Sequence, residues 1–153
     1  MQRHIFSRFF GKMANVGLAE LAQYFATYYF DMRTAHFKVS GNEFLEVHGY
    51  AQELYEQAED YYDDIIETCI SLKEDFVPMY VLSKNWKPDE LEFGDDVKSV
   101  VAAMRGWTQM MYDYVEAVDR ERYPSFVGSK LDSIMEWLDK QCYKLGQMCG
   151  ETA

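Results

Sequence analysis

The chain has 153 residues, enough for one domain that buries most of the surface of the unfolded chain. Its hydrophobic share of 48% and charged share of 27% are typical of a globular protein. The net charge of −11 argues against a body that attracts DNA phosphates or anionic membranes, and it favours cations as partners.

Residues 1–14 form a tail or helix start, and residues 15–149 are predicted to form one helical domain. A first helix is expected over residues 15–37, where apolar positions recur every three or four residues. Residues 39–42 break this pattern, and Asn42 is expected to cap the next helix. The second helix is predicted over residues 43–73, and its apolar stripe comprises Phe44, Val47, Ala51, Leu54, Ala58, Tyr61, Ile65, Cys69 and Leu72.

The segment 74–94 contains Pro78 and Pro88 and is too long for a tight hairpin between helices. It predicts a crossover from one end of the bundle to the other. Further amphipathic helices are expected over residues 95–122 and 129–149. The predicted fold class is therefore all-α, a ferritin-like four-helix bundle with a long crossover between helices two and three. An aromatic content of 16% suggests additional buried interfaces.

The cysteines Cys69, Cys142 and Cys149 form neither a disulfide framework nor a zinc motif. Reduced thiols in the cytoplasm are the simplest interpretation. No apolar run approaches the ~18 residues of a membrane span, so no membrane partner is expected. We therefore expect a cytoplasmic protein.

The chain contains only three histidines, and two of them flank the predicted turn between helices one and two. Helical geometry places side chains at about 100° intervals. With Ala51 at zero, the apolar stripe spans roughly −80° to +20°. Four polar residues fall at about 60°, 100°, 120° and 160°, beside the stripe. These residues are His48, Gln52, Asp63 and Glu67.

His48 and Asp63 are separated by about 22 Å of helix, whereas a metal–ligand bond is about 2 Å long. One helix therefore cannot bring both residues to one ion. Two antiparallel copies can, if a two-fold axis crosses the helix between the two positions. Each site would then hold two imidazoles and two carboxylates, a ligand set that suits iron or zinc.

The stretch from His36 to His48 reads His-Phe-Lys-Val-Ser-Gly-Asn-Glu-Phe-Leu-Glu-Val-His. It resembles the Dps family, the mini-ferritins, which have a His followed by an aromatic residue and a second His twelve residues later. The family then has Asp, Asp and Glu at four, fifteen and nineteen residues after the second His. This chain has Gln52, Asp63 and Glu67 there, so four of five ferroxidase positions match.

The resemblance implies a dodecameric homo-oligomer that binds and stores iron and oxidises Fe(II), with peroxide as the favoured oxidant, in protection against oxidative damage. It assigns His36 and His48 to one subunit and Asp63 and Glu67 to its two-fold partner. Gln52 departs from the pattern, because a neutral amide is a weaker ligand than a carboxylate. Phe37 replaces the family's usual Trp, which puts an electron-donor role of that residue in doubt.

Three other interpretations are open. True ferritins carry Glu-x-x-His pairs, but the residues three before His36 and His48 are Arg33 and Leu45. A helical interaction module without chemistry would bring the histidines and carboxylates together only by chance. A Dps-like shell that oxidises iron poorly because of Gln52, and acts as a structural or DNA-associated protein, lies between the two.

DNA contact is conceivable through the basic residues of the tail, because twelve copies would act together. The favoured interpretation is that the tail packs on a neighbouring subunit. Its basic residues are Arg3, His4, Arg8 and Lys12.

Overall fold

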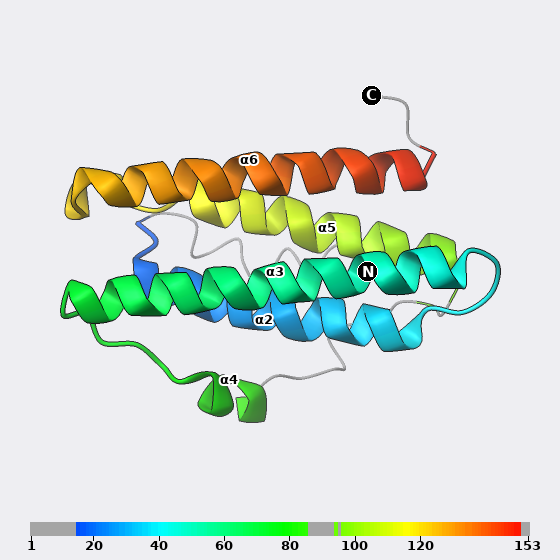
Figure 1. Cartoon of the computed structure of the whole chain (residues 1–153), viewed down its shortest axis with the longest axis horizontal. Helices are drawn as coiled ribbons and strands as arrows, with labels where there is room; N and C mark the ends of the chain where they lie inside the picture. Colours follow the sequence, from blue (N-terminus) through cyan, green and yellow to red (C-terminus); the bar gives the residue numbers. More distant parts are fainter. Residues whose placement is uncertain (1–14, 86–93, 95, 151–153) are drawn as a thin grey trace.

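The structure, a computed structural model, describes residues 15–85, 94 and 96–150 and is built from helices (Figure 1). Two isolated backbone bridges are the β-type pairings found in this part of the chain. The prediction of an all-α bundle is confirmed. The helices are α2 Leu18–Lys38, α3 Phe44–Ser71, α4 Met79–Asn85, α5 Val97–Glu116, the 3-10 helix η3 Arg120–Arg122 and α6 Ser125–Met148.

The helices α2 and α3 form an antiparallel hairpin closed by a tight turn. Gly41 and Glu43 both have positive φ, at 97° and 67°, and the Phe44 amide donates to the Gly41 carbonyl. The prediction that Asn42 caps the second helix is wrong. The N-cap is Glu43, which makes no capping hydrogen bond through its side chain, because the left-handed turn places the helix start one residue later.

Backbone bridges fix the direction of α5 relative to the hairpin. Val16 pairs with Val118 at one end of the bundle, and Ser40 pairs with Asp96 at the other. Helix α5 therefore runs antiparallel to α2 and parallel to α3. Glu74, just after α3, forms a 2.8 Å ion pair with Arg122 at the first of these ends.

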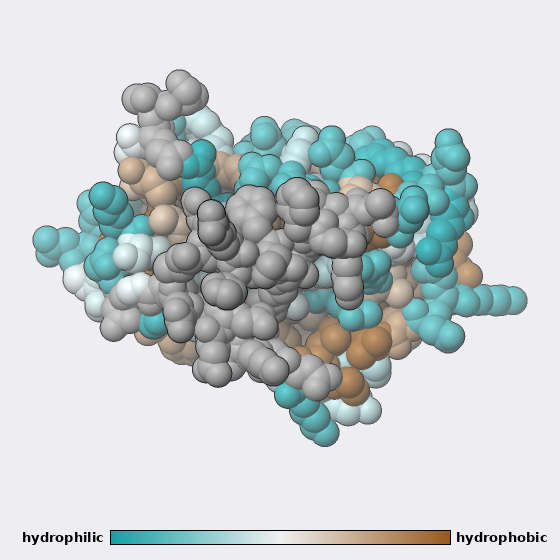
Figure 2. Space-filling view, turned by 180° about the vertical axis from the view of Figure 1, so that it is seen from behind, coloured by the Kyte–Doolittle hydropathy of each residue, from teal (hydrophilic) through white to brown (hydrophobic). Residues whose placement is uncertain are grey.

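The sequence prediction missed α4, which lies outside the four long helices in Figure 1. No helix was predicted in the segment 74–94, but Pro78 stands just before α4, and its carbonyl accepts from the Val81 and Leu82 amides. Proline is tolerated at a helix start because its missing N–H needs no partner there. Figure 2, the view from behind, shows hydrophobic side chains along the lower edge, on the side where Figure 1 places α4.

Two predicted boundaries also shift. Helix α5 ends at Glu116 rather than at residue 122, because Val118 pairs with Val16 and η3 follows. Helix α6 begins at Ser125 rather than at residue 129, and Pro124 serves as its N-cap. Proline fixes φ near the helical value, so it favours a helix start directly after it.

The predicted apolar stripes face a shared core. Val47, Ala51, Leu54, Ala58 and Ile65 of α3 are buried, and so are Leu18 and Leu21 of α2 and Leu131, Leu138 and Leu145 of α6. Sequence periodicity missed four tyrosines that also lie in the core: Tyr28, Tyr55, Tyr62 and Tyr114. No helix in the described ranges is long and apolar enough to cross a membrane. Pro88 and the basic residues of the N-terminal tail lie outside the described residues.

Candidate metal site

His36, near the end of α2, and His48, near the start of α3, stack on each other with ring centroids 3.5 Å apart. The His36 Nδ1 lies 2.7 Å from the His48 carbonyl oxygen, and the His48 Nδ1 lies 2.6 Å from the His36 carbonyl oxygen. A carbonyl oxygen only accepts, so each Nδ1 carries the proton. In the neutral rings Nε2 then keeps its lone pair, which is the form that binds a metal.

Two aromatic side chains contact the His36 ring. The Tyr55 ring meets the buried His36 ring edge-on at 5.4 Å, and the Phe37 ring lies 5.0 Å from it. The guanidinium of Arg33 lies 5.1 Å from the Tyr55 ring centroid and 5.9 Å from that of Phe37. The positive charge of Arg33 therefore lies against the two rings that contact His36. Its sequence signal was the placement of Tyr29 and Phe37 four residues before and after Arg33.

The other predicted ligands lie farther along α3. Asp63 and Glu67 are exposed and one helical turn apart, and Gln52 is exposed one turn after His48. These positions agree with the angular argument, which placed them beside the core stripe. Within the described ranges, no three or more His, Cys, Asp or Glu side chains gather closely enough to hold a metal ion. One chain thus brings His36 and His48 together and leaves Asp63 and Glu67 apart from them.

Gln52 has a partner within its own helix. Its Nε2 atom donates a 2.8 Å hydrogen bond to the Glu56 carboxylate. The amide nitrogen, which cannot bind a metal, is thereby directed toward Glu56. The remaining amide oxygen is a neutral donor atom, weaker than the carboxylate of the Dps pattern.

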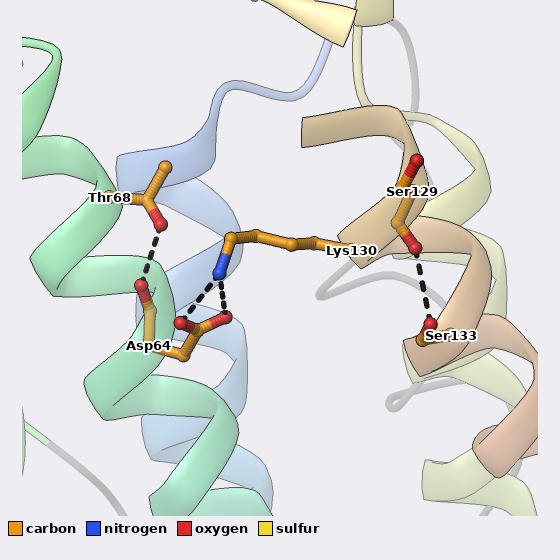
Figure 3. A network of polar contacts seen from close by, with 5 residues as sticks. All are labelled: Asp64, Thr68, Ser129, Lys130 and Ser133. Carbon is orange, nitrogen blue, oxygen red and sulfur yellow. Dashed lines mark hydrogen bonds and ion pairs between the residues drawn. The ribbon is translucent and has the colours of Figure 1, made fainter. Parts of the chain in front are cut away.

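Asp64 differs from its neighbour Asp63 in its surroundings. Figure 3 shows the Lys130 ammonium of α6 reaching both Asp64 carboxylate oxygens, at 2.7 and 2.8 Å, while the Thr68 hydroxyl donates to the Asp64 carbonyl. Asp64 therefore ties α3 to α6. The exposed Asp63 remains the carboxylate of this pair that can face another molecule.

No protein-family model matches the chain, and no curated protein is significantly similar to it. The resemblance to the Dps family therefore rests on the residue pattern and stays a proposal.

Proposed function

We propose that this chain is a Dps-like iron-binding subunit that oxidises Fe(II) at sites shared between two-fold partners. The observation that carries the proposal is the histidine pair. Both Nδ1 atoms donate to backbone carbonyls, so both Nε2 atoms keep the lone pair that a metal needs.

The fold supports the proposal at the level of architecture. In a ferritin-like bundle, helices two and three run parallel and are joined by a long crossover. Helices α3 and α5 run parallel here, and the segment between them starts beside Arg122 and ends at Asp96, beside Ser40. We infer that this segment is the crossover and that the bundle is ferritin-like.

In the proposed site, His36 and His48 bind Fe(II) from one subunit, and Asp63 and Glu67 of the partner subunit complete the ligand set. Two carboxylates balance the charge of one divalent ion. Two ferrous ions would each give one electron to hydrogen peroxide, so that its O–O bond breaks and two ferric ions and two hydroxide ions form. The hydrogen bond from Gln52 to Glu56 favours a shell in which each site binds one iron ion tightly and a second one weakly. Such a site would oxidise Fe(II) slowly.

The test is complementation between two defective chains. His36→Ala/His48→Ala chains and Asp63→Ala/Glu67→Ala chains should each lose tight Fe(II) binding, measured by calorimetry without oxygen. After the two chains are unfolded together and refolded, each mixed pair has one intact site, so binding should return in part. A Glu53→Ala/Asp60→Ala chain, which loses the same charge from exposed positions on α3, should bind normally.

If both defective chains lose Fe(II) binding and mixing them never restores it, the shared site is contradicted. Full binding by both defective chains would contradict the ligand assignment itself.

A further inference from the structure

Two tyrosines on neighbouring helices lie with their rings stacked. Tyr24 of α2 and Tyr114 of α5 have ring centroids 3.8 Å apart, and their ring planes differ by 23°. Tyr114 is 1% exposed, whereas Tyr24 is partly exposed. Tyr24 precedes His36 by about 18 Å along α2, so this pair is separate from the candidate metal site.

The phenol of Tyr24 has a proton acceptor within hydrogen-bond distance. Its hydroxyl donates a 2.6 Å hydrogen bond to the Glu20 carboxylate, one turn earlier on α2. A hydrogen bond to an ionised acceptor is short and strong. Burial, this hydrogen bond and the nearby Tyr114 together raise the pKa of Tyr24, so the phenol keeps its proton at neutral pH.

Both features favour the loss of one electron from Tyr24. A phenol that loses an electron becomes a strong acid, so oxidation is easier where a base already holds the hydroxyl proton. The stacked ring of Tyr114 helps as well, because the electron-rich face of an aromatic ring stabilises a positive charge beside it.

We propose that Tyr24 and Tyr114 form a self-crosslinking site, at which oxidising radicals join the two rings as dityrosine and tie α2 to α5 covalently. The oxidants are one-electron acceptors, such as the hydroxyl radical that peroxide yields with ferrous iron. This site is independent of the proposed function, because the crosslink needs an oxidising radical and no iron site.

The crosslink forms in two oxidations at Tyr24. The first radical takes one electron from Tyr24, and the hydroxyl proton passes to Glu20 and from there to water. The buried Tyr114 then gives a hydrogen atom to the Tyr24 oxygen and becomes a phenoxyl radical. A second oxidant removes an electron and a proton from Tyr24 by the same route.

The two phenoxyl radicals then combine. One carbon–carbon bond forms between the ring positions beside the hydroxyl-bearing carbons, and stacked rings present these positions face to face. The hydrogen atoms of the two bonded carbons move to the phenol oxygens. In total the two phenols lose two electrons and two protons, and two hydroxyl radicals take them up to become two water molecules.

A second pair of tyrosines lacks these features. Tyr29 and Tyr55 meet edge-on, with ring centroids 5.8 Å apart and an angle of 82° between the rings. The Tyr29 hydroxyl accepts a 2.9 Å hydrogen bond from Arg33, whose guanidinium lies 5.1 Å from the Tyr55 ring centroid. A cation opposes the loss of an electron and takes up no proton. We therefore expect no dityrosine at this pair, although Tyr55 contacts His36.

The test exposes the iron-free full chain to azide radicals, made by radiolysis in the presence of a chelator. Azide radicals remove single electrons and add no oxygen. Fluorescence detects dityrosine, and peptide mass spectrometry locates it, because the linked peptides weigh two hydrogen atoms less than the separate ones. We expect a link between Tyr24 and Tyr114 of one chain, so the product keeps the mass of a single chain on a denaturing gel.

Three variants test the parts of the site. Tyr114→Phe keeps the ring but removes the phenol, and it should abolish the link. Glu20→Gln keeps the size of the side chain but removes the base, and it should lower the yield of dityrosine several-fold. Tyr29→Phe is the matched control and should give the yield of the unchanged protein. Circular dichroism of each variant checks that the helices are intact.

The link should also stabilise the fold. It closes a loop of about 90 residues and restricts the unfolded chain as a disulfide of the same span would. The oxidised protein should therefore melt at a higher temperature than the untreated protein. The oxidised Tyr114→Phe variant should show no such rise.

Three results would overturn the proposal: a link mapped to Tyr29 and Tyr55, a link between two chains, or no dityrosine after the azide radicals have been consumed. An unchanged yield in Glu20→Gln would overturn Glu20 as the proton acceptor. Iron is absent from this test, so its outcome does not depend on whether the chain binds iron.

Discussion

At the scale of single residues, the candidate site depends on the imidazole rings of His36 and His48 and on the backbone carbonyls of the same two residues. Each ring is fixed by a hydrogen bond from its own Nδ1 to the other residue's carbonyl, so its orientation does not depend on a bound ion. A site whose side chains are already ordered loses less conformational freedom when it binds a ligand. The residue that departs from the Dps pattern, Gln52, is also held, by its bond to Glu56.

Gln52→Asp should increase the number of iron ions bound per site and speed oxidation. A carboxylate about 4 Å from a cation gains about 4 kcal/mol per pair of unit charges at an effective dielectric of 20, before desolvation is counted. Even a third of this is roughly tenfold in affinity. Calorimetry gives the stoichiometry, and absorbance gives the rate of oxidation.

The matched control is Gln52→Asn, which shortens the side chain equally but adds no charge. If both variants behave like the unchanged protein, the missing charge at position 52 does not limit the site.

Because of two thiols, the folded protein should become less stable at alkaline pH. Burial raises the pKa of Cys69 and of Cys142 from an ordinary 9.0 to about 11. Both thiols are neutral at pH 7 in the folded and the unfolded chain. Between pH 9 and about 11 the unfolded chain loses these protons first, so the free energy of unfolding should fall as pH rises through this window.

Urea titrations at closely spaced pH values from 7 to 10 check this, because most of that range lies below the ordinary tyrosine pKa. A Cys69→Ala/Cys142→Ala chain should show a shallower decline. An identical slope in both chains would assign the alkaline loss to other groups.

At the scale of elements, helix ends and the ties between helices determine which side chains remain available. Asp64 forms an ion pair with Lys130 of α6, whereas the residue before it, Asp63, is exposed. Periodicity separates the two residues by only 100° and does not reveal Lys130 as a partner. Elsewhere in the bundle, Tyr123 joins the start of α2 to Glu74, which follows α3.

Tyr123→Phe should lower the free energy of unfolding by about 1–2 kcal/mol. The Tyr123 hydroxyl accepts a 2.8 Å hydrogen bond from the Leu18 amide and lies 3.3 Å from the Glu74 carboxylate, to which it donates. Its removal leaves the first amide of α2 without this acceptor. Denaturation by urea measures the loss at a fixed protein concentration.

Tyr143→Phe is the control, because Tyr143 is an exposed tyrosine on α6 and should change stability by less than about 0.5 kcal/mol. Equal losses in the two variants would mean that the helix-end bond contributes nothing measurable.

At the scale of the whole molecule, the proposed shared site requires a larger assembly. We expect a dodecamer, as the Dps resemblance implies, in which the two-fold contacts between α3 helices form the iron sites. Light scattering at neutral pH checks the mass. A monomer across the micromolar range would contradict both the assembly and the shared site, because neither set of ligands is complete alone.

The sequence by itself determined the four long helices, their buried stripes and the placement of Gln52, Asp63 and Glu67 beside the stripe of α3. These follow from the 3.6-residue period, which is a local property of the chain. Prediction from the sequence placed the N-cap wrongly at Asn42, did not include α4 and extended the third helix past Glu116. Those boundaries depend on a left-handed turn, a proline at a helix start and the pairing of Val118 with Val16.

Only the tertiary structure decided the tautomers of His36 and His48, and which of Asp63 and Asp64 pairs with Lys130. These features arise from contacts between residues of different helices, such as the 2.7 Å ion pair between Asp64 and Lys130. Periodicity specifies the side of a helix on which a residue lies. It contains no information about the atom that the folded chain places opposite that residue, and that atom determines which side chains remain available for other contacts.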